Sequence, residues 1–172
     1  MSALAAVLAS VTLAYVLSAA EHSRGHAAAR YFAGRLALVR AQAVARGTAV
    51  GLRFDEGPGG FTFTAFQDGN GDGIRTADIE AGVDTLLEPP TSLFEQFPGV
   101  DIALAAGTPA TDPLQIGRTN LLTFTPIGTA TSGTIYIRDR DGSQWAVRIL
   151  GATGRTRVLR YDVRTKAWLV AH

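Results

Sequence analysis

SALAAVLASVTLAYVLSAAEHSRGHAAARYFAGRLALVRAQAVARG, residues 2–47, is the stretch that decides the fold. Its first part, Ser2 to Ala20, contains no charged residue and no Gly or Pro. At ~1.5 Å per residue, a helix of this length spans close to the ~30 Å of a bilayer core. A secretory signal peptide would explain the small residues before Glu21, but its basic first region is missing. We therefore predict a membrane helix over residues 1–21.

Residues 22–47 continue the helix with a different pattern. Arg24, Arg35 and Arg46 are spaced by about three helical turns and so share one face. Gly47 is a suitable C-terminal cap. An apolar stripe for packing is expected on the other side, formed by Tyr31, Phe32, Leu36, Leu38, Val39 and Ala43. The sequence thus predicts one long helix whose second half, 22–47, docks on a soluble domain.

Two histidines of this segment, His22 and His26, are four residues apart and could face one metal ion. A protein zinc site needs at least three ligands, and no third ligand lies nearby in the sequence. Histidines on a helix surface are therefore the favoured interpretation.

From residue 48 onward the apolar period changes to two, which indicates strands. Residues 48–54 and 60–67 alternate apolar with polar residues and are joined by a Gly/Pro turn, which predicts a β-hairpin. Phe94, Phe97 and Trp145 are expected to fill the core, and 105–119 to form a loop. Further strands are predicted at 100–104, 121–126, 133–139, 144–151 and 156–162.

The predicted fold class is α+β. A long N-terminal helix, with a membrane half and an amphipathic half, packs on one or two antiparallel β-sheets. The β-rich head covers residues 48–172, and together with the amphipathic helix it makes one domain, 22–172.

The charges of the chain are segregated along the sequence. Residues 21–53 carry six arginines and one acid, residues 54–113 carry eleven acids and one arginine, and eight bases follow from Arg138 onward. Such blocks fit surfaces of opposite sign, suited to self-assembly or to contact with a polyanion, unless folding mixes them into an evenly solvated surface. The absence of cysteine excludes disulfides, thiolate metal sites and a cysteine nucleophile.

The arrangement resembles the GspH/FimT branch of the type IV pilin-like proteins. Residues 33–54 resemble the family's passage from helix to first strand, LLTFTPIGTATSGTIYI (121–137) is similar to its strand-turn-strand signature, and GATGRTRVLRYD (151–162) to its closing hairpin. The resemblance implies a minor pilin or pseudopilin, a structural component of a type II secretion pseudopilus or a type IV pilus. The implied partners are other pilins or pseudopilins and the assembly platform of the bacterial inner membrane, with the soluble domain in the periplasm.

The chain departs from the family's pattern at its start. Members have a short basic leader, Gly-Phe at the prepilin-peptidase site and a Glu at the fifth mature residue, whereas Met1 here opens directly into the apolar run. We expect the true start to lie upstream. A divergent member, without peptidase processing or docking through that Glu, is the alternative.

One acidic segment has the composition of a Ca²⁺ loop. In DGNGDG (68–73), oxygen-bearing side chains alternate with glycines, and glycine occupies the sixth position. The twelfth position is Ile79 where an EF-hand loop needs Glu. A hairpin turn rich in Asp, Asn and Gly is the competing interpretation. The ligands of a bound Ca²⁺ would be Asp68, Asn70 and Asp72, with Asp78 or Glu80.

A basic segment near the end is the second candidate site. Arg155 and Arg157 point to the same side of a strand, with Arg160 nearby, and guanidinium groups side by side suit phosphate oxygens. FimT-like relatives bind DNA for uptake, so the resemblance implies DNA as a possible partner of these residues. A solvated sheet edge, or contact with the acids of a neighbouring subunit, is the alternative.

No motif of an enzyme is present: the sequence lacks a nucleophile elbow and a phosphate-binding glycine loop opening a helix. The sequence therefore predicts an assembly protein. The alternatives are a DNA-binding minor pilin and an ordinary secreted β domain behind an unusual signal peptide.

Overall fold

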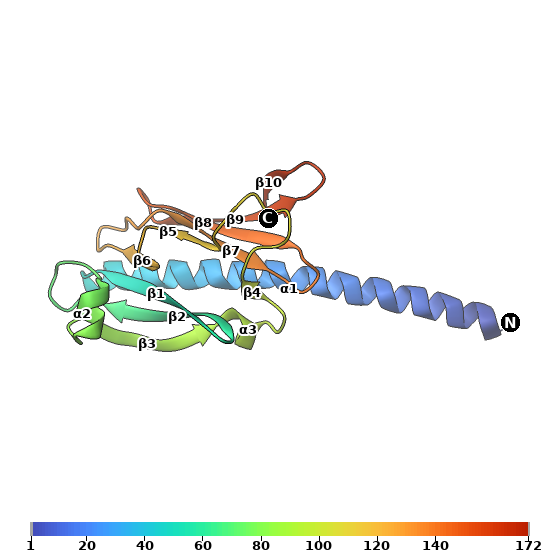
Figure 1. The fold of residues 1–172 in the computed structure, drawn as a ribbon, viewed down its shortest axis with the longest axis horizontal. Helices are drawn as coiled ribbons and strands as arrows, with labels where there is room; N and C mark the ends of the chain where they lie inside the picture. The colour runs from blue at the N-terminus through green and yellow to red at the C-terminus, as the bar shows by residue number, and fades with distance from the viewer. Residues whose placement is uncertain (1, 172) are drawn as a thin grey trace.

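A single long helix packs against the β strands and extends beyond them. The computed structural model describes the backbone of residues 2–171 and the side chains of residues 24–171. Helix α1 spans Ser2–Arg46 and ends at Gly47, whose φ of +65° confirms the predicted C-terminal cap. Its second half lies along the β strands, whereas its first half extends beyond them (Figure 1).

One face of the docked half of α1 is buried. Ala28, Phe32, Leu36, Val39 and Ala43 are fully buried, at the spacing of three and four residues that keeps side chains on one side of a helix. The predicted packing of Leu38 is wrong, because this side chain is 45% exposed. Successive helical residues are turned by about 100°, which takes Leu38 away from the sheets when Val39 faces them.

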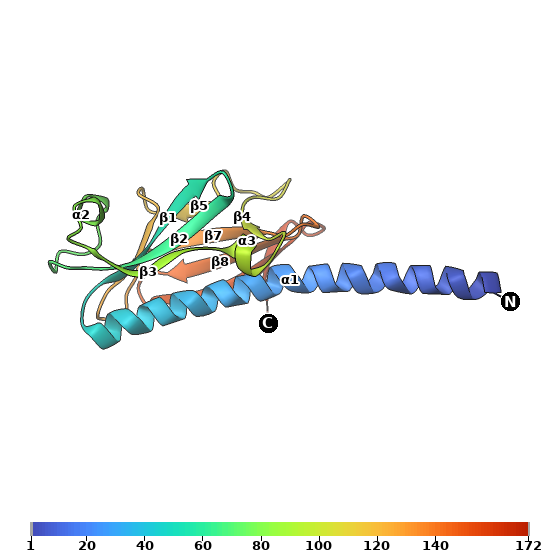
Figure 2. The same cartoon turned by 90° about the horizontal axis from the view of Figure 1, so that it is seen from below.

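Within residues 2–171, ten strands form two antiparallel sheets against this helix (Figure 2). The smaller sheet has the order β3-β2-β1-β6, with bounds Thr85–Ser92, Gly60–Gln67, Val50–Gly57 and Leu121–Phe124. The larger sheet has the order β10-β9-β8-β7-β4, with bounds Ala167–Val170, Arg155–Asp162, Gln144–Leu150, Gly133–Arg138 and Asp101–Ile102. Strand β5 (Leu114–Ile116) pairs with β7, and two short helices, α2 (Thr76–Glu80) and α3 (Leu93–Gln96), complete the fold.

The core lies between α1 and both sheets. Phe32 of α1 meets Phe54 of β1 and Phe63 of β2, with ring centroids 6.1 and 5.2 Å apart. Edge-to-face pairs at these separations add to the free energy gained by burying the rings. Valine and isoleucine residues of β7 and β8 close the same core from the larger sheet. The predicted α+β class is confirmed, with two sheets.

Polar contacts fix α1 to the smaller sheet. Arg35 forms an ion pair with Glu88 of β3, and the Arg46 guanidinium donates a hydrogen bond of 3.0 Å to the Gln67 side chain of β2. Two of the three arginines that the sequence placed on one helical face therefore bind the same sheet.

The structure contains three strands that the sequence pattern did not predict. Strand β3 was missed because it carries Pro89 and Pro90, which only an edge strand tolerates. Strands β5 and β10 are three and four residues long, and β5 lies inside the predicted loop 105–119. The remaining predicted strands are present, with ends shifted by a few residues.

Two of the three aromatic residues expected in the core are packed. Trp145 is 4% exposed, and Phe97 packs on Tyr31 with ring centroids 5.5 Å apart. Phe94 is 47% exposed, so its predicted burial is wrong. It belongs to the short helix α3, which turns only Leu93 toward the core.

The predicted membrane segment, residues 1–21, falls outside the side chains that the structure describes, and it stays a prediction. Among the residues whose side chains the structure describes, no helix has the length and apolarity needed to cross a membrane. The boundary between the anchor and the periplasmic domain also stays a prediction.

Candidate functional site

The outward face of α1 carries an apolar stripe that nothing in the described chain covers. Its members recur at helical spacing and are exposed, with Leu38 at 45% and Val44 at 52%. We call this set the α1 stripe; it consists of Gly34, Ala37, Leu38, Ala41, Val44 and Ala45. It is uncharged, and its small residues allow another backbone to approach closely.

Helix α1 leaves the β body at a close contact around Gly25. A Cβ atom at this position would lie 2.5 Å from Trp145 Nε1 and would also collide with the Asp139 carboxylate. Only glycine lets the helix come this near to the larger sheet. His26 stacks on the Trp145 ring with centroids 5.0 Å apart. Burial lowers the pKa of His26, and the charge of Arg30 lowers this pKa further.

Three exposed arginines form what we call the basic face, on the side of the larger sheet away from α1. Arg157 of β9 lies directly opposite Arg148 of β8, and Arg155 lies opposite Leu150. Partners in an antiparallel register point to the same side, with Cβ atoms about 5 Å apart. Among the described side chains, none of the three arginines is in an ion pair.

Tyr136 belongs to this side of the sheet, in a small cluster with Ala146 and Leu159. Burial raises the pKa of its hydroxyl, and the charge of Arg148 partly opposes that rise.

The structure does not bring Arg160 to the basic face. Side chains alternate along a strand, so Arg160 points to the side of Val158, which packs in the main core. Its guanidinium carbon lies 5.7 Å from the centre of the Trp145 ring, toward α1. Of the three predicted DNA-binding residues, only Arg155 and Arg157 are therefore neighbours on one surface.

The acidic segment 68–84 is organised by backbone hydrogen bonds. The Asp68 carboxylate accepts from the N–H groups of Asn70, Gly71 and Gly73, at 2.7 to 3.1 Å. Asp84, which is 2% exposed, accepts from two further N–H groups of the same segment. This is the pattern of a turn rich in Asp, Asn and Gly. The sequence pattern did not predict a role for Asp84, because that role depends on burial, which is decided by the tertiary structure.

Of the other predicted ligands, Asn70 and Asp72 belong to this turn, and Asp78 and Glu80 to helix α2, which follows it. The side chain of Asn70 accepts from the Asp72 N–H at 3.2 Å, and Asp72 also pairs with Arg75. Within the described residues, no group of three or more His, Asp or Glu side chains is arranged to hold a metal. A calcium site here stays a prediction, which a calorimetric titration of the chain with Ca²⁺ would test.

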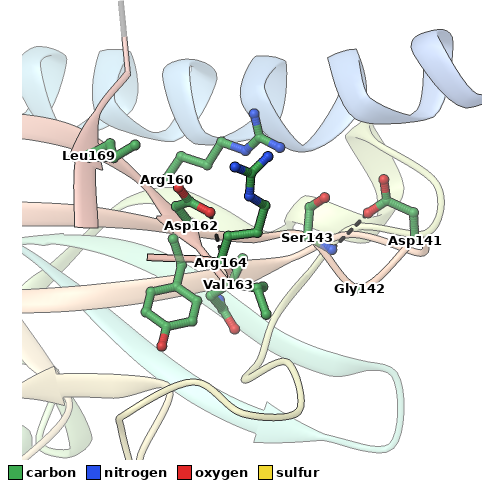
Figure 3. A pocket seen from close by; sticks show the side chains of 10 residues that line it. Asp141, Gly142, Ser143, Arg160, Asp162, Val163, Arg164 and Leu169 are labelled. Atoms are coloured by element: carbon green, nitrogen blue, oxygen red, sulfur yellow. Dashed lines mark hydrogen bonds between the residues drawn. The ribbon is translucent and has the colours of Figure 1, made fainter. Parts of the chain in front are cut away.

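A cavity of about 570 Å³ opens at the end of the larger sheet, beside α1 (Figure 3). Arg160 and Arg164 contribute its basic groups, and Val163 and Leu169 its apolar wall. The Asp162 carboxylate accepts hydrogen bonds of 2.9 Å from the Arg164 N–H and the Thr165 hydroxyl. The hydrogen bonds from Thr165 and Arg164 hold the pKa of Asp162 below its usual value. The sequence pattern did not predict this site, because β10 was not recognised as a strand.

Comparison with known proteins gives consistent matches. The profile of the family described as "Type II transport protein GspH" matches residues 28–154. Among solved structures, the fold is similar to that of the minor pseudopilin EpsH from the Type 2 Secretion System of Vibrio cholerae. The TM-score is 0.52 at 21% sequence identity, over 80% of this chain and 97% of that chain. A search of the curated proteins finds no significant match.

Proposed function

Because the chain belongs to the GspH family of type II transport proteins, we propose that it is a minor pseudopilin. In this role, residues 1–21 anchor it by a single pass in the bacterial inner membrane, and the β-rich head lies in the periplasm. The chain then joins other pseudopilins, together with the inner-membrane assembly platform, in a pseudopilus or a type IV pilus.

The α1 stripe is the observation that carries this proposal. An uncharged helical face in contact with water is costly unless another apolar surface covers it, since each Å² of apolar surface contributes roughly 25 cal/mol when removed from water. The stripe belongs to the docked half of α1, and the first half of the same helix extends past the sheets (Figure 1). Arg30 is exposed and lies one turn before Gly34 on the same face, so the uncharged surface available for packing against the helices of neighbouring subunits covers residues 34–45.

A charged residue placed on the stripe tests this role. In Ala41→Arg the new side chain points outward from an exposed position, so the head should fold normally. We expect loss of co-purification with the other pseudopilins and loss of secretion in a complementation assay. Ala152→Arg, an equal change at an exposed position in the β8–β9 turn, is the matched control. Normal assembly of Ala41→Arg would contradict the proposal.

The basic face favours a second candidate, a FimT-like minor pilin that binds DNA for uptake. Its exposed arginines offer guanidinium groups from two adjacent strands at a spacing suited to phosphates.

Binding of the full chain in detergent to duplex DNA, at two salt concentrations, tests this candidate. DNA binding should weaken with salt, and Arg155→Ala/Arg157→Ala should reduce both the affinity and the salt dependence. Arg164→Ala/Lys166→Ala removes the same charge from the other end of the sheet and is the control. If neither the wild type nor the control binds DNA at low salt, the basic face serves assembly instead.

A further inference from the structure

The larger sheet ends in two turns at the place where α1 leaves the body (Figures 1 and 3). Residues 139–143 join β7 to β8, and residues 163–166 join β9 to β10. The Trp145 side chain meets α1 at Gly25, and Trp145 is the register partner of Arg160 on β9. The β9–β10 turn therefore lies on the side of Gly25 that faces the N-terminal half of α1.

The position of this turn along the axis of α1 follows from the rise per residue of strand and helix. From Arg160, strand β9 continues for two residues to Asp162, which is roughly 6–7 Å at ~3.3 Å per residue. The same distance corresponds to about four residues of helix at ~1.5 Å each. The turn is thus level with about residue 21 of α1, where the uncharged run of the sequence ends.

The turn combines apolar and basic side chains in contact with solvent. Val163 is 72% exposed, and Arg164 and Lys166, which follow it in the turn, carry two positive charges. Leu169, 51% exposed, continues the apolar surface in the wall of the cavity.

The carboxylates at this end accept hydrogen bonds from the N–H groups of their own turns. The Asp139 and Asp141 carboxylates both accept from the Ser143 N–H, and Asp162 is held by the hydrogen bonds described above. Arg164 and Lys166 are exposed and, within the described residues, form no ion pair, so their charges are accessible to an external anion.

We propose that the β9–β10 turn, Asp162–Lys166, rests on the anionic phospholipid headgroups of the membrane that holds α1. Val163 enters the headgroup layer, while Arg164 and Lys166 bind lipid phosphates. Surfaces that mix exposed apolar side chains with lysine and arginine bind anionic lipid in this way. The proposal rests on the proposed function, since α1 must be anchored for the turn to reach the bilayer.

Position and charge favour lipid over a protein partner. The surface is a single narrow turn at the predicted edge of the bilayer, whereas a stable protein interface buries about 800 Å² on each side. Contact at this point would add a second attachment beside α1 and would fix the rotation of the head about the helix.

The experiment uses the full chain in nanodiscs. Because the sequence has no cysteine, Val163→Cys can carry one nitroxide label. Its collision rates with oxygen, which concentrates in lipid, and with a water-soluble nickel chelate report depth. Thr153→Cys, an exposed position in the β8–β9 turn at the other end of the sheet, is the control label. In phosphatidylglycerol nanodiscs we expect the Val163 label at headgroup depth and the Thr153 label in water.

Removing the basic charges separates electrostatic contact from mere proximity. In Arg164→Gln/Lys166→Gln the equilibrium constant for turn–membrane contact should fall roughly thirtyfold, because each basic residue near an anionic surface contributes about fivefold. The matched control, Arg155→Gln/Arg157→Gln, removes two charges far from the turn and should change nothing. Replacing phosphatidylglycerol by phosphatidylcholine should reproduce the effect of the double variant.

The outcomes distinguish this proposal from the proposed function. A chain that fails to stay with the nanodisc contradicts the anchor itself. A chain that stays while the Val163 label is as water-exposed as the Thr153 label overturns the lipid contact alone. Shielding of Val163 that occurs only when other pseudopilins are added would also overturn it and would assign the turn to a protein partner.

Discussion

Replacing Gly25 by alanine should destabilise the protein, although alanine is normally the better helix former. The added Cβ would lie 2.5 Å from Trp145 Nε1, where about 3.5 Å is comfortable for non-bonded atoms. Trp145 is 4% exposed and packed in the core, so it has little room to move aside. Overpacking of this kind costs about 1–3 kcal/mol, against a gain in helix propensity of about 1 kcal/mol.

Gly34 provides a matched comparison on the same helix. A Cβ there meets no atom within 4 Å, so Gly34→Ala should gain about 0.5–1 kcal/mol in the free energy of unfolding. The two variants should therefore differ by roughly 1–3 kcal/mol. For a chain of this size each kcal/mol moves the melting temperature by about 2–4 °C, which gives a difference of roughly 2–12 °C.

Thermal unfolding of the full chain in mild detergent, followed by tryptophan fluorescence, measures this difference. The wild type should melt between the two variants or close to Gly25→Ala. If Gly25→Ala melts at or above the temperature of Gly34→Ala, helix α1 does not approach the larger sheet as closely as the structure has it. The geometry around Trp145 would then be wrong.

Three further perturbations follow from the same packing. Phe32→Ala, in the centre of the core, should lower the free energy of unfolding by about 3–5 kcal/mol in urea denaturation, and a loss below about 1 kcal/mol would place Phe32 outside the core. Asp84→Ala leaves two backbone N–H groups without an acceptor, so it should lower the free energy of unfolding by about 1–3 kcal/mol. Hydrogen exchange should become faster in segment 68–84 specifically, and unchanged exchange there would contradict the role of Asp84 in holding this segment. The pKa of His26 is lower in the folded state than in the unfolded chain. As the pH drops below about 6.5, the unfolded chain therefore takes up a proton at this residue more readily than the folded protein, and the free energy of unfolding should fall. His26→Phe keeps the stacking on Trp145 and should reduce the loss of melting temperature between pH 7 and pH 5; an equal loss in both proteins would assign the pH dependence to other groups.

The alternation of residues along a strand predicted only part of the basic face. Alternation placed Arg155 and Arg157 on one side of β9, and the structure adds Arg148 to them through the β8–β9 register. Arg160 is three residues beyond Arg157, an odd number, so it lies on the opposite side and contacts Trp145 instead. Which side faces the solvent is decided by where α1 packs, and this cannot be obtained from the strand itself.

The sequence by itself determined the long helix, its end at Gly47, the β1–β2 hairpin and the later strands β7 to β9, because each rests on local periodicity and turn residues. Only the tertiary structure decided that Leu38 faces outward, that Asp84 is buried beneath the acidic segment, and that short or proline-containing segments join the sheet edges as β3, β5 and β10. The physical reason is that these features depend on which segments, remote in the sequence, pack on a residue and exclude water from it. A short edge strand owes its conformation to hydrogen bonds from its neighbour, and its own side chains hold too little pattern to specify it.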